Sequence, residues 1–509
     1  MSQAGVRIET RSGVLAGRLE EGLAVFRGVP YARAPVGPLR WREPEREPVW
    51  SGARDAGRFG PMAPQRPGVL MRMLGINGAA TDEDCLTLNA WAPHASGAGA
   101  RRGRPVLVWL HGGGFTAGAG SLPVYDGRHL AWRGDAVVVT VNYRLGALGF
   151  LALAEAGVAA NAGLLDQIAA LAWVREHAER LGGDPDNVTV FGESAGAMSI
   201  GALLGAPAAR GLFRRAVLQS GAAHNVSPAA GAERIAASFR RATGLAAADL
   251  ASLRALSAEA ALDAQQRVVD ESWKTVEGLA FQPSVDGAAI PQAPLDAVSA
   301  GAADGVSLLV GTNRDEWSLF ALPDAKLRRL DEAGLVRRLL RSPLAAPGES
   351  GPQPFADRAI ECYRAARAAR GLPIEPRDLW IALQSDRVFR IPAVRLAERQ
   401  SAREPRTYAY LFDWPSPALG GALGSCHGLE VPFVFGTLGG ATAQLVGEGG
   451  QVARLAARIQ DAWLAFARSG DPGWPAYDAA ARSTMVLGRD CGVAADPMAE
   501  ERRFWEGRL

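Results

Sequence analysis

The chain has 509 residues, with 55 Lys and Arg against 53 Asp and Glu, so its formal net charge at pH 7 is +2. Apolar residues make up 48% and charged residues 21%, as is ordinary for a globular protein. The balanced charge, with no basic block, gives no reason to expect a nucleic-acid or membrane-surface partner.

Targeting and redox signals are sparse. Residues 1–22 are polar and charged and lack the apolar core of a signal peptide. The sequence contains no run of about 18 uncharged apolar residues, so we expect no membrane-spanning helix. The four cysteines are scattered and lack metal-ligand spacing: Cys85, Cys362, Cys426 and Cys491. We therefore expect free thiols, a cytoplasmic location, no metal site and no cofactor.

From about residue 105 to 220, strand-like runs alternate with helical stretches. The apolar runs Val106–Leu110 and Ala136–Val141 are typical of strands buried on both faces. Leu164–Leu181 has helical spacing, and Asp184–Asn187 predicts a turn into the short strand Val188–Phe191. This alternation predicts a large, mainly parallel sheet with helices on both faces and right-handed crossovers.

The rest of the chain is less regular. Residues 322–376 mix Pro, Arg and Gly without a clear period, so no structure is assigned to them. The other segments that can be assigned are a surface loop at Ala95–Gly103, helices within 228–265, strands at Ser307–Thr312 and Thr407–Asp413, and a long amphipathic helix at Val452–Arg468.

A candidate nucleophile lies in the run Gly192-Glu193-Ser194-Ala195-Gly196. Glycine occupies 60 of 509 positions, so a lone Gly-x-Ser-x-Gly is weak evidence. Here the run follows the predicted strand Val188–Phe191 and precedes the helix-compatible stretch Ala195–Leu204. That setting is what a nucleophile elbow requires, whereas the simpler alternative is a glycine-rich turn with a capping serine.

A second glycine cluster, His111-Gly112-Gly113-Gly114-Phe115, directly follows the strand Val106–Leu110. Acyl transfer needs backbone N–H groups aimed at the oxyanion, and consecutive glycines let the main chain approach closely. A flexible or phosphate-binding turn is the alternative, but no Gly-Lys-Ser/Thr follows, which excludes a P-loop. Together, the two motifs predict a serine hydrolase.

With these motifs in place, the chain resembles the type-B carboxylesterases, an α/β-hydrolase family that includes cholinesterases and bacterial para-nitrobenzyl esterases. The resemblance spans nearly the whole sequence and also rests on Phe26–Ala32, Glu83–Asn89, Asn161–Gln167 and Gly183–Thr189. It implies the α/β-hydrolase fold: one domain over residues 1–509, with helical insertions around 225–300 and 320–405.

The triad order Ser, acid, His leaves two candidate bases after Ser194, namely His224 and His427. His224 is too close to the nucleophile for an acid-bearing strand to intervene comfortably, and the loop around His427 matches the family's histidine loop. Asp315 and Glu316 could both orient an imidazole. The resemblance selects Glu316 and leaves Asp315 as a structural residue of the turn.

The resemblance also implies supporting residues. The oxyanion hole would consist of the N–H groups of Gly113, Gly114 and Ala195. Glu193 and Ser220 would support the triad, although Ser220 is almost equally well explained as a strand-end turn residue. Because a histidine must be neutral to act as a base, enzyme activity should fall on acidification through roughly pH 6–7, where an ordinary imidazole becomes protonated.

Two positions depart from the family pattern. Ala63 stands where secreted relatives carry the disulfide partner of the cysteine equivalent to Cys85, and Trp317 follows the acid where many relatives have glycine. The predicted function is hydrolysis of small-molecule carboxylic esters, by a chain that is expected to be a monomer. The alternatives are hydrolysis of amides, carbamates or polyesters at the same site, or a binding protein without catalytic activity. We expect the walls of the cleft within 62–80 and 320–450.

Overall fold

The computed structural model describes residues 5–66, 68, 80–94, 103–153, 157–245, 250–272, 279–341 and 352–508. These residues form one 13-stranded sheet. Its strands are β1 (Gly5–Glu9), β2 (Val14–Glu20), β3 (Leu23–Pro30), β4 (Ala53–Asp55), β5 (Thr87–Pro93), β6 (Arg104–Leu110), β7 (Val137–Val141), β8 (Gly183–Glu193), β9 (Arg215–Gln219), β10 (Ser307–Asn313), β11 (Thr407–Asp413), β12 (Ser483–Gly488) and β13 (Gly492–Ala495).

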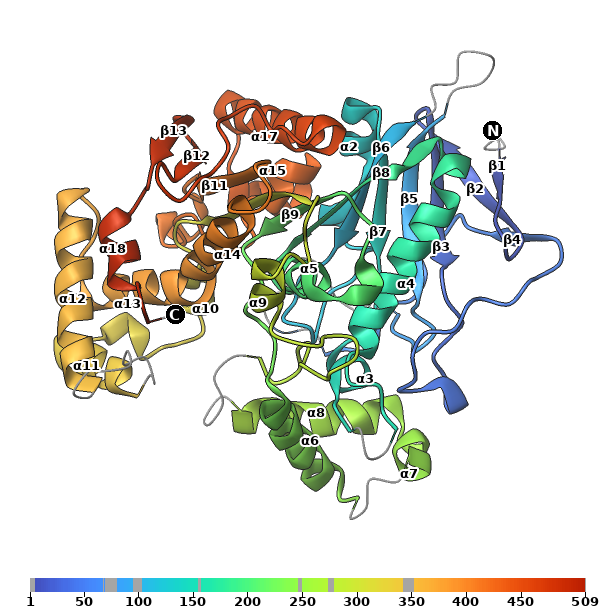
Figure 1. Cartoon of the computed structure of the whole chain (residues 1–509), viewed down its shortest axis with the longest axis horizontal. Coiled ribbons are helices and arrows are strands. Elements are labelled where there is room, and N and C mark those ends of the chain that lie inside the picture. Colours follow the sequence, from blue (N-terminus) through green and yellow to red (C-terminus); the bar gives the residue numbers. More distant parts are fainter. Residues whose placement is uncertain are drawn as a thin grey trace.

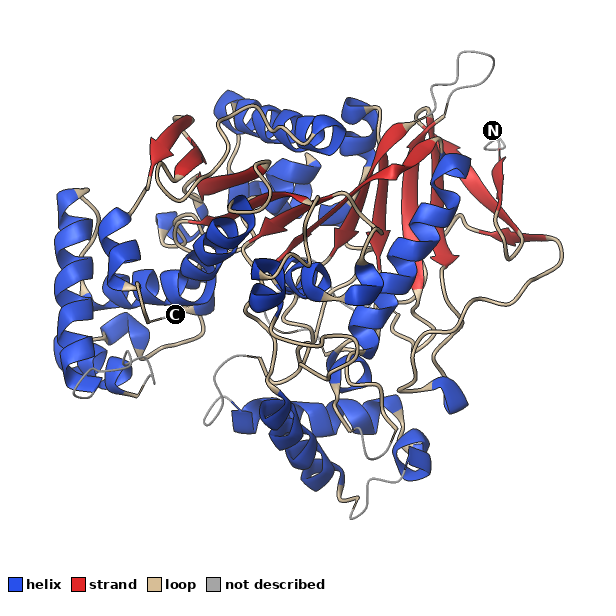
Figure 2. Ribbon diagram, in the orientation of Figure 1, coloured by secondary structure: helices blue, strands red, loops and turns tan. Residues whose placement is uncertain are grey.

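The helices lie around this sheet (Figure 2). They are α2 (Arg128–Gly134), α3 (Gly146–Phe150), α4 (Ala162–His177), α5 (Ala195–Gly205), α6 (Ala229–Thr243), α7 (Leu250–Ala255), α8 (Ala258–Ser272), α9 (Pro294–Ser299), α10 (Trp317–Phe320), α11 (Glu332–Leu340), α12 (Pro352–Ala369), α13 (Pro376–Ser385), α14 (Ile391–Ser401), α15 (Val431–Phe435), α16 (Ala443–Val446), α17 (Gly450–Ser469) and α18 (Ala499–Phe504).

The strand order is β1-β2-β3-β5-β7-β6-β8-β9-β10-β11-β12-β13, with β4 paired to β2. Strands from β7 to β12 in this order pair in parallel, whereas the β1-to-β7 side and the β12–β13 edge are antiparallel. The predicted fold class, a large and mostly parallel sheet covered by helices, is confirmed.

Strand β6 shows why both faces are covered. Val106, Val108 and Leu110 belong to one hydrophobic core, while Leu107 and Trp109 belong to another. Successive side chains of a strand point to opposite faces, so a continuous apolar run needs a packed layer on each side. Helices α4, α5 and α14 pack against one face of the sheet, and α2 and α17 against the other (Figure 1).

Several predicted elements are confirmed within a few residues. The strand Thr407–Asp413 has the predicted bounds, and the helix predicted at Val452–Arg468 is α17. The predicted turn at Asp184–Asn187 is wrong, because these residues lie inside β8, where its register against β6 shifts. The predicted loop Ala95–Gly103 falls, apart from Gly103, outside the described residues.

Two groups of helices stand away from the sheet (Figure 1). Helices α6, α7 and α8 lie together at the bottom of the view, and α11, α12, α13 and α18 lie together at the left. The unassigned stretch 322–376 supplies α11 and α12, which pack on each other, with residues 342–351 outside the description. Among the described helices, none is both long and apolar enough to span a membrane.

Candidate active site

Ser194 occupies a tight turn between β8 and α5. Its φ of 55° and ψ of −125° lie in a region that a residue with a side chain rarely adopts. Glycines on either side allow this turn: a Cβ on Gly196 would lie 1.9 Å from the carbonyl oxygen of Leu110, and one on Gly192 would lie 2.7 Å from it. The serine is half-buried, and its N–H donates to Gln219 O at 2.9 Å. This strand–turn–helix geometry is that of a nucleophile elbow.

The glycine loop after β6 lies against this turn. A Cβ on Gly112 would be 3.1 Å from Ser194 Cβ. Gly113 and Gly114 have φ values of 115° and 61°, and a Cβ on Gly113 would lie 2.1 Å from the carbonyl oxygen of Ala117. Within the described chain, the N–H groups of Gly113, Gly114 and Ala195 donate to no acceptor. Unpaired donors beside a serine can bind an oxyanion.

His111, which opens this loop, has a structural place. It is buried, its Nδ1 lies 2.8 Å from Gly112 O, and its ring stacks on Tyr143 at 4.4 Å between centroids. Burial lowers the pKa of His111 to about 4, so the ring is neutral at physiological pH. Tyr143 Oη also donates to His111 O, which fixes the start of the loop.

The structure brings His427 and Glu316 together across 111 residues of sequence. His427 Nδ1 lies 2.6 Å from Glu316 Oε2, and the Glu316 side chain is fully buried. Glu316 Oε1 accepts from Asn313 N at 2.8 Å, so both carboxylate oxygens are engaged. Asp315, the other candidate acid, instead accepts from Ser425 N and pairs with Arg314, which is the structural role expected of it.

The second nitrogen of His427 faces Glu193. His427 Nε2 is 3.0 Å from Glu193 Oε1, although the pair lacks hydrogen-bond geometry. Among the described residues, no hydrogen bond joins His427 to Ser194. Nucleophile–base hydrogen bonds are often long in unliganded enzymes and tighten with substrate.

Two carboxylates therefore flank one imidazole. Burial opposes charge on His427, but Glu193 and Glu316 outweigh it and raise the pKa of His427 above its ordinary value. Burial likewise raises the pKa of Glu193, a shift that the charge of His427 reduces. An enzyme that used such an imidazole as its base would lose activity on acidification from a higher pH than an ordinary imidazole predicts.

A network of hydrogen bonds around a third carboxylate lies behind Glu316 and His427. Glu430 is buried and accepts from Asn313 Nδ2 at 2.6 Å and from Gln219 Nε2 at 3.1 Å, and burial raises its pKa. Trp463 Nε1 donates to Gln219 Oε1 at 3.1 Å. Sequence reasoning missed this network, although Glu430 lies three residues after His427 in the matched loop.

Ser220, a predicted supporting residue, directly follows β9 and has a left-handed conformation with a φ of 53°. Its N–H donates to Gly311 O at 2.9 Å. Its buried Oγ has no hydrogen-bond partner among the described side chains, so the structure does not join it to the triad.

Aromatic side chains form the wall beside His427. The rings of Phe389 and Phe320 lie 4.7 and 5.0 Å from the imidazole, and the two stack on each other at 6.0 Å. Phe389 is buried, whereas Phe320 is 38% exposed. Trp317 packs on Phe320 at 5.0 Å, which gives the unusual residue after the acid a place in this wall. Beside the glycine loop, Leu279 Cδ2 would lie 3.8 Å from a Cβ placed on Gly114.

These walls lie within the predicted range 320–450, except for Trp317 and Leu279. Most of the other predicted wall, 62–80, falls outside the described residues. Phe320 was not singled out from the sequence. Its spacing of four residues from Glu316 could have indicated it, because residues four apart lie on one face of a helix.

His224, the other candidate base, has no carboxylate partner among the described residues. It is exposed to solvent, and its ring forms a hydrogen bond with the backbone of Val388. A histidine without an acid partner does not complete a triad.

The four cysteines are free, as predicted: Cys85 and Cys426 are buried, and Cys362 and Cys491 are half-buried. Over the described ranges, no three His, Cys, Asp or Glu side chains are arranged to hold a metal ion.

Comparisons with known proteins agree with this geometry. The family model described as the carboxylesterase family matches residues 4–505. The para-nitrobenzyl esterase of Bacillus subtilis is 39% identical over 97% of both chains, and the phenmedipham hydrolase of Pseudarthrobacter oxydans is 37% identical over 96% of both. The solved carboxylesterase of Geobacillus stearothermophilus superposes with a TM-score of 0.85 at 37% identity, over 98% of this chain and 99% of that one.

Proposed function

This chain belongs to the carboxylesterase family and is a carboxylic-ester hydrolase, and we propose that Ser194, His427 and Glu316 are its nucleophile, base and acid. The observation that carries this assignment is the contact of 2.6 Å between His427 Nδ1 and the buried Glu316. Glu316 follows β10 and His427 follows β11, at the carboxyl end of the parallel strands, where Ser194 directly follows β8. Ligands of parallel α/β sheets bind at this edge.

Hydrolysis would proceed by two acyl transfers. Ser194 Oγ attacks the ester carbonyl while His427 Nε2 accepts its proton, and the imidazolium then protonates the leaving alkoxide. Water then enters and attacks the acyl-enzyme carbonyl while His427 Nε2 accepts one of its protons. When this second tetrahedral intermediate collapses, the imidazolium returns that proton to Ser194 Oγ, which releases the carboxylic acid and restores the free enzyme. Glu316 holds the tautomer in which Nδ1 carries the proton and stabilises the imidazolium.

The oxyanion of each tetrahedral intermediate would bind to the N–H groups of Gly113, Gly114 and Ala195. These donors are unpaired in the described structure, so they need no rearrangement before reaction. Removing one such donor costs about 10²–10³ in rate in comparable enzymes.

The test is Ser194→Ala, with Ser299→Ala as the matched control. Ser299 lies on the exposed side of α9, where its Oγ bonds only within its own helix. We expect Ser194→Ala to retain the folded circular dichroism spectrum and to lose turnover of p-nitrophenyl butyrate and labelling by an organophosphate. Normal turnover by that variant would contradict the assignment.

The aromatic wall supports a preference for apolar groups near His427. A panel of p-nitrophenyl esters of increasing acyl length, together with amides and carbamates of the same groups, would rank the substrate classes. The carbamate arm is included because a relative of similar identity is named a phenmedipham hydrolase.

We also infer a monomeric enzyme that works in the cytoplasm without a cofactor or a nucleic-acid partner. The near-neutral charge and four unpaired cysteines support this inference. Light scattering coupled to gel filtration tests the oligomeric state.

A further inference from the structure

The helix that forms part of the cleft wall is interrupted by a π-helical turn. Residues 376–401 run through α13, a π turn at Asp386–Arg390, and α14. Pro392 explains the interruption, because it lies four residues after Val388. A proline at that position has no N–H for the Val388 carbonyl, and its ring would collide with that carbonyl in a regular α-helix. Such π turns are rare and frequently occur at functional sites.

This π turn carries Phe389 to the catalytic histidine. Phe389 is 2% exposed, so its ring is held by packing between His427 and Phe320. A change in the path of the turn would therefore move the ring that supports both the base and the exposed part of the aromatic wall.

The start of the π turn is fixed by a buried hydrogen-bond relay from the C-terminal part of the chain. Trp505 Nε1 donates to Tyr363 Oη at 2.7 Å, and Tyr363 Oη donates to Asp386 Oδ2. Arg390, at the end of the turn, donates to the same carboxylate through Nη2 at 2.7 Å. Trp505, Tyr363 and Asp386 are each at most 1% exposed, so no solvent replaces a lost partner.

The relay also joins parts of the chain that are far apart in sequence. Tyr363 lies in α12, and Trp505 directly follows α18, which packs on α12. Arg395 Nη2 of α14 donates to Trp505 O at 2.9 Å, which fixes the tryptophan from the other side.

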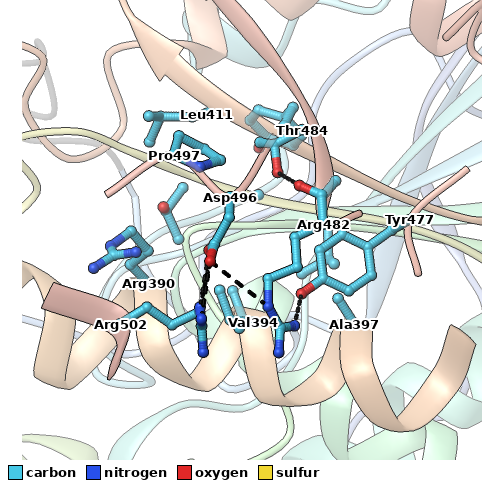
Figure 3. A pocket seen from close by; sticks show the side chains of 16 residues that line it. Arg390, Val394, Ala397, Leu411, Tyr477, Arg482, Thr484, Asp496, Pro497 and Arg502 are labelled. Atoms are coloured by element: carbon cyan, nitrogen blue, oxygen red, sulfur yellow. Dashed lines mark hydrogen bonds and ion pairs between the residues drawn. The ribbon is translucent and has the colours of Figure 1, made fainter. Parts of the chain in front are cut away.

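Space behind the turn allows it to move. A cavity of about 40 Å³ lies between the sheet, α14 and the segment before α18, and Arg390 lines it (Figure 3). Its charged lining residues are paired: Asp496 bridges Arg482 and Arg502 across one side of it (Figure 3). The cavity therefore offers no free charge to a ligand, but it leaves room for Arg390 and the turn to relax.

We propose that Tyr363 and Trp505 are positioning residues for catalysis, which act through Asp386 and the π turn to hold Phe389 against His427. The proposal rests on the assignment of His427 as the base. It connects the C-terminal helix to the active site through three side chains, none of which reaches the reacting atoms.

The physical reason lies in the tyrosine hydroxyl. Tyr363→Phe keeps the ring but leaves Trp505 Nε1 unpaired and removes one donor from Asp386, both in a buried setting where unpaired groups are costly. The turn can respond by shifting toward the cavity. Because small misplacements of catalytic groups lower rates by up to about 10²-fold, we expect roughly a tenfold loss in kcat.

The experiment compares Tyr363→Phe, Trp505→Phe, Phe389→Leu and the double variant Tyr363→Phe/Phe389→Leu. Tyr477→Phe is the matched control, since Tyr477 is another buried tyrosine that lines the same cavity and accepts a hydrogen bond from Arg482, with no link to the π turn. Measured quantities are kcat, KM and the pH profile of kcat/KM for p-nitrophenyl butyrate. An active-site burst corrects each value for the fraction of competent enzyme.

We expect Tyr363→Phe to lower kcat roughly tenfold and to shift the acid limb of the pH profile, with Trp505→Phe acting in the same direction. In the Phe389→Leu background, Tyr363→Phe should have no further effect, because the contact it controls is already gone. Tyr477→Phe should stay within about twofold of the parent.

Two results would overturn the proposal: a Tyr363→Phe enzyme that matches Tyr477→Phe in kcat and pH profile, or one whose full loss persists in the Phe389→Leu background. If Tyr363→Phe does not accumulate as folded protein, Trp505→Phe is judged by the same two criteria. Activity retained by His427→Ala would instead refute the underlying assignment of the base, which keeps the two failures distinct.

Discussion

Glu193 faces His427 Nε2, the nitrogen proposed to act as the base, and Glu193→Gln measures the effect of its charge. In the folded protein the Glu193 carboxylate, 3.0 Å from His427 Nε2, favours the charged imidazolium, which cannot act as a base. Glutamine keeps the shape of the side chain and removes the charge. The pKa of His427 should therefore fall, and the acid limb of kcat/KM should move to lower pH.

The size of the shift can be bounded. An opposite charge within about 4–6 Å shifts a pKa by roughly 1–3 units. The pKa of Glu193 is itself raised, so this carboxyl is partly protonated near neutrality and exerts less than its full pull. We therefore expect about one unit. Below both pKa values, one unit corresponds to about a tenfold larger fraction of neutral His427.

The assay is kcat/KM for p-nitrophenyl acetate from about pH 5 to 10, followed at the isosbestic wavelength of the product. Glu430→Gln serves as the comparison, because this buried carboxylate does not touch the imidazole and raises the pKa of His427 less than Glu193 does, so its acid limb should move by less. An acid limb that stays in place, or moves to higher pH, in Glu193→Gln would refute the claim that Glu193 raises the pKa of the base.

Four further outcomes follow from the same geometry. Gly113→Ala should lose about 10²–10³ in kcat, because its Cβ would meet the Ala117 carbonyl and displace the oxyanion loop. Gly114→Ala meets only Leu279 among the described residues and is strained only by its left-handed φ of 61°, so it should lose less; kcat and Tm of the two variants test this. Glu316→Gln should lower kcat by up to about 10⁴, measured at saturating ester, because Asn313 N and His427 Nδ1 both need the carboxylate. Phe320→Ala should raise KM for p-nitrophenyl esters with a large apolar acyl group by up to about tenfold and leave KM for p-nitrophenyl acetate nearly unchanged in the same assay. Dialysis against EDTA should leave kcat unchanged.

The sequence was most informative where one strand and one turn decide the chemistry. The apolar run before Ser194, the glycines beside it and the glycine cluster after Leu110 are local signals, and each has a local structural cause. Glu316 and His427 could be assigned only through the family resemblance, because their meeting depends on the pairing of β10 with β11.

The remaining features depend on contacts that no local pattern encodes. That Glu193 faces His427 follows from the direction of a side chain in a strained turn. The Trp505–Tyr363–Asp386 relay joins residues more than 100 positions apart. Pro392 was a readable sign of a break in the helix, but only the structure shows that this break directs Phe389 to the histidine.

The pairing of β10 with β11 also determines how this enzyme could be recombined with its relatives. The chain leaves the sheet after Asn313 and returns at Thr407 on the adjacent strand, so the excursion between them begins and ends on neighbouring strands. Such a segment can in principle be exchanged as a module, since the junctions are preserved. Here the module would have to include α18 and Trp505, because the relay makes the end of the chain a structural part of it. A chimera that exchanges residues 314–406 alone would separate Tyr363 from the tryptophan that completes its hydrogen bonds.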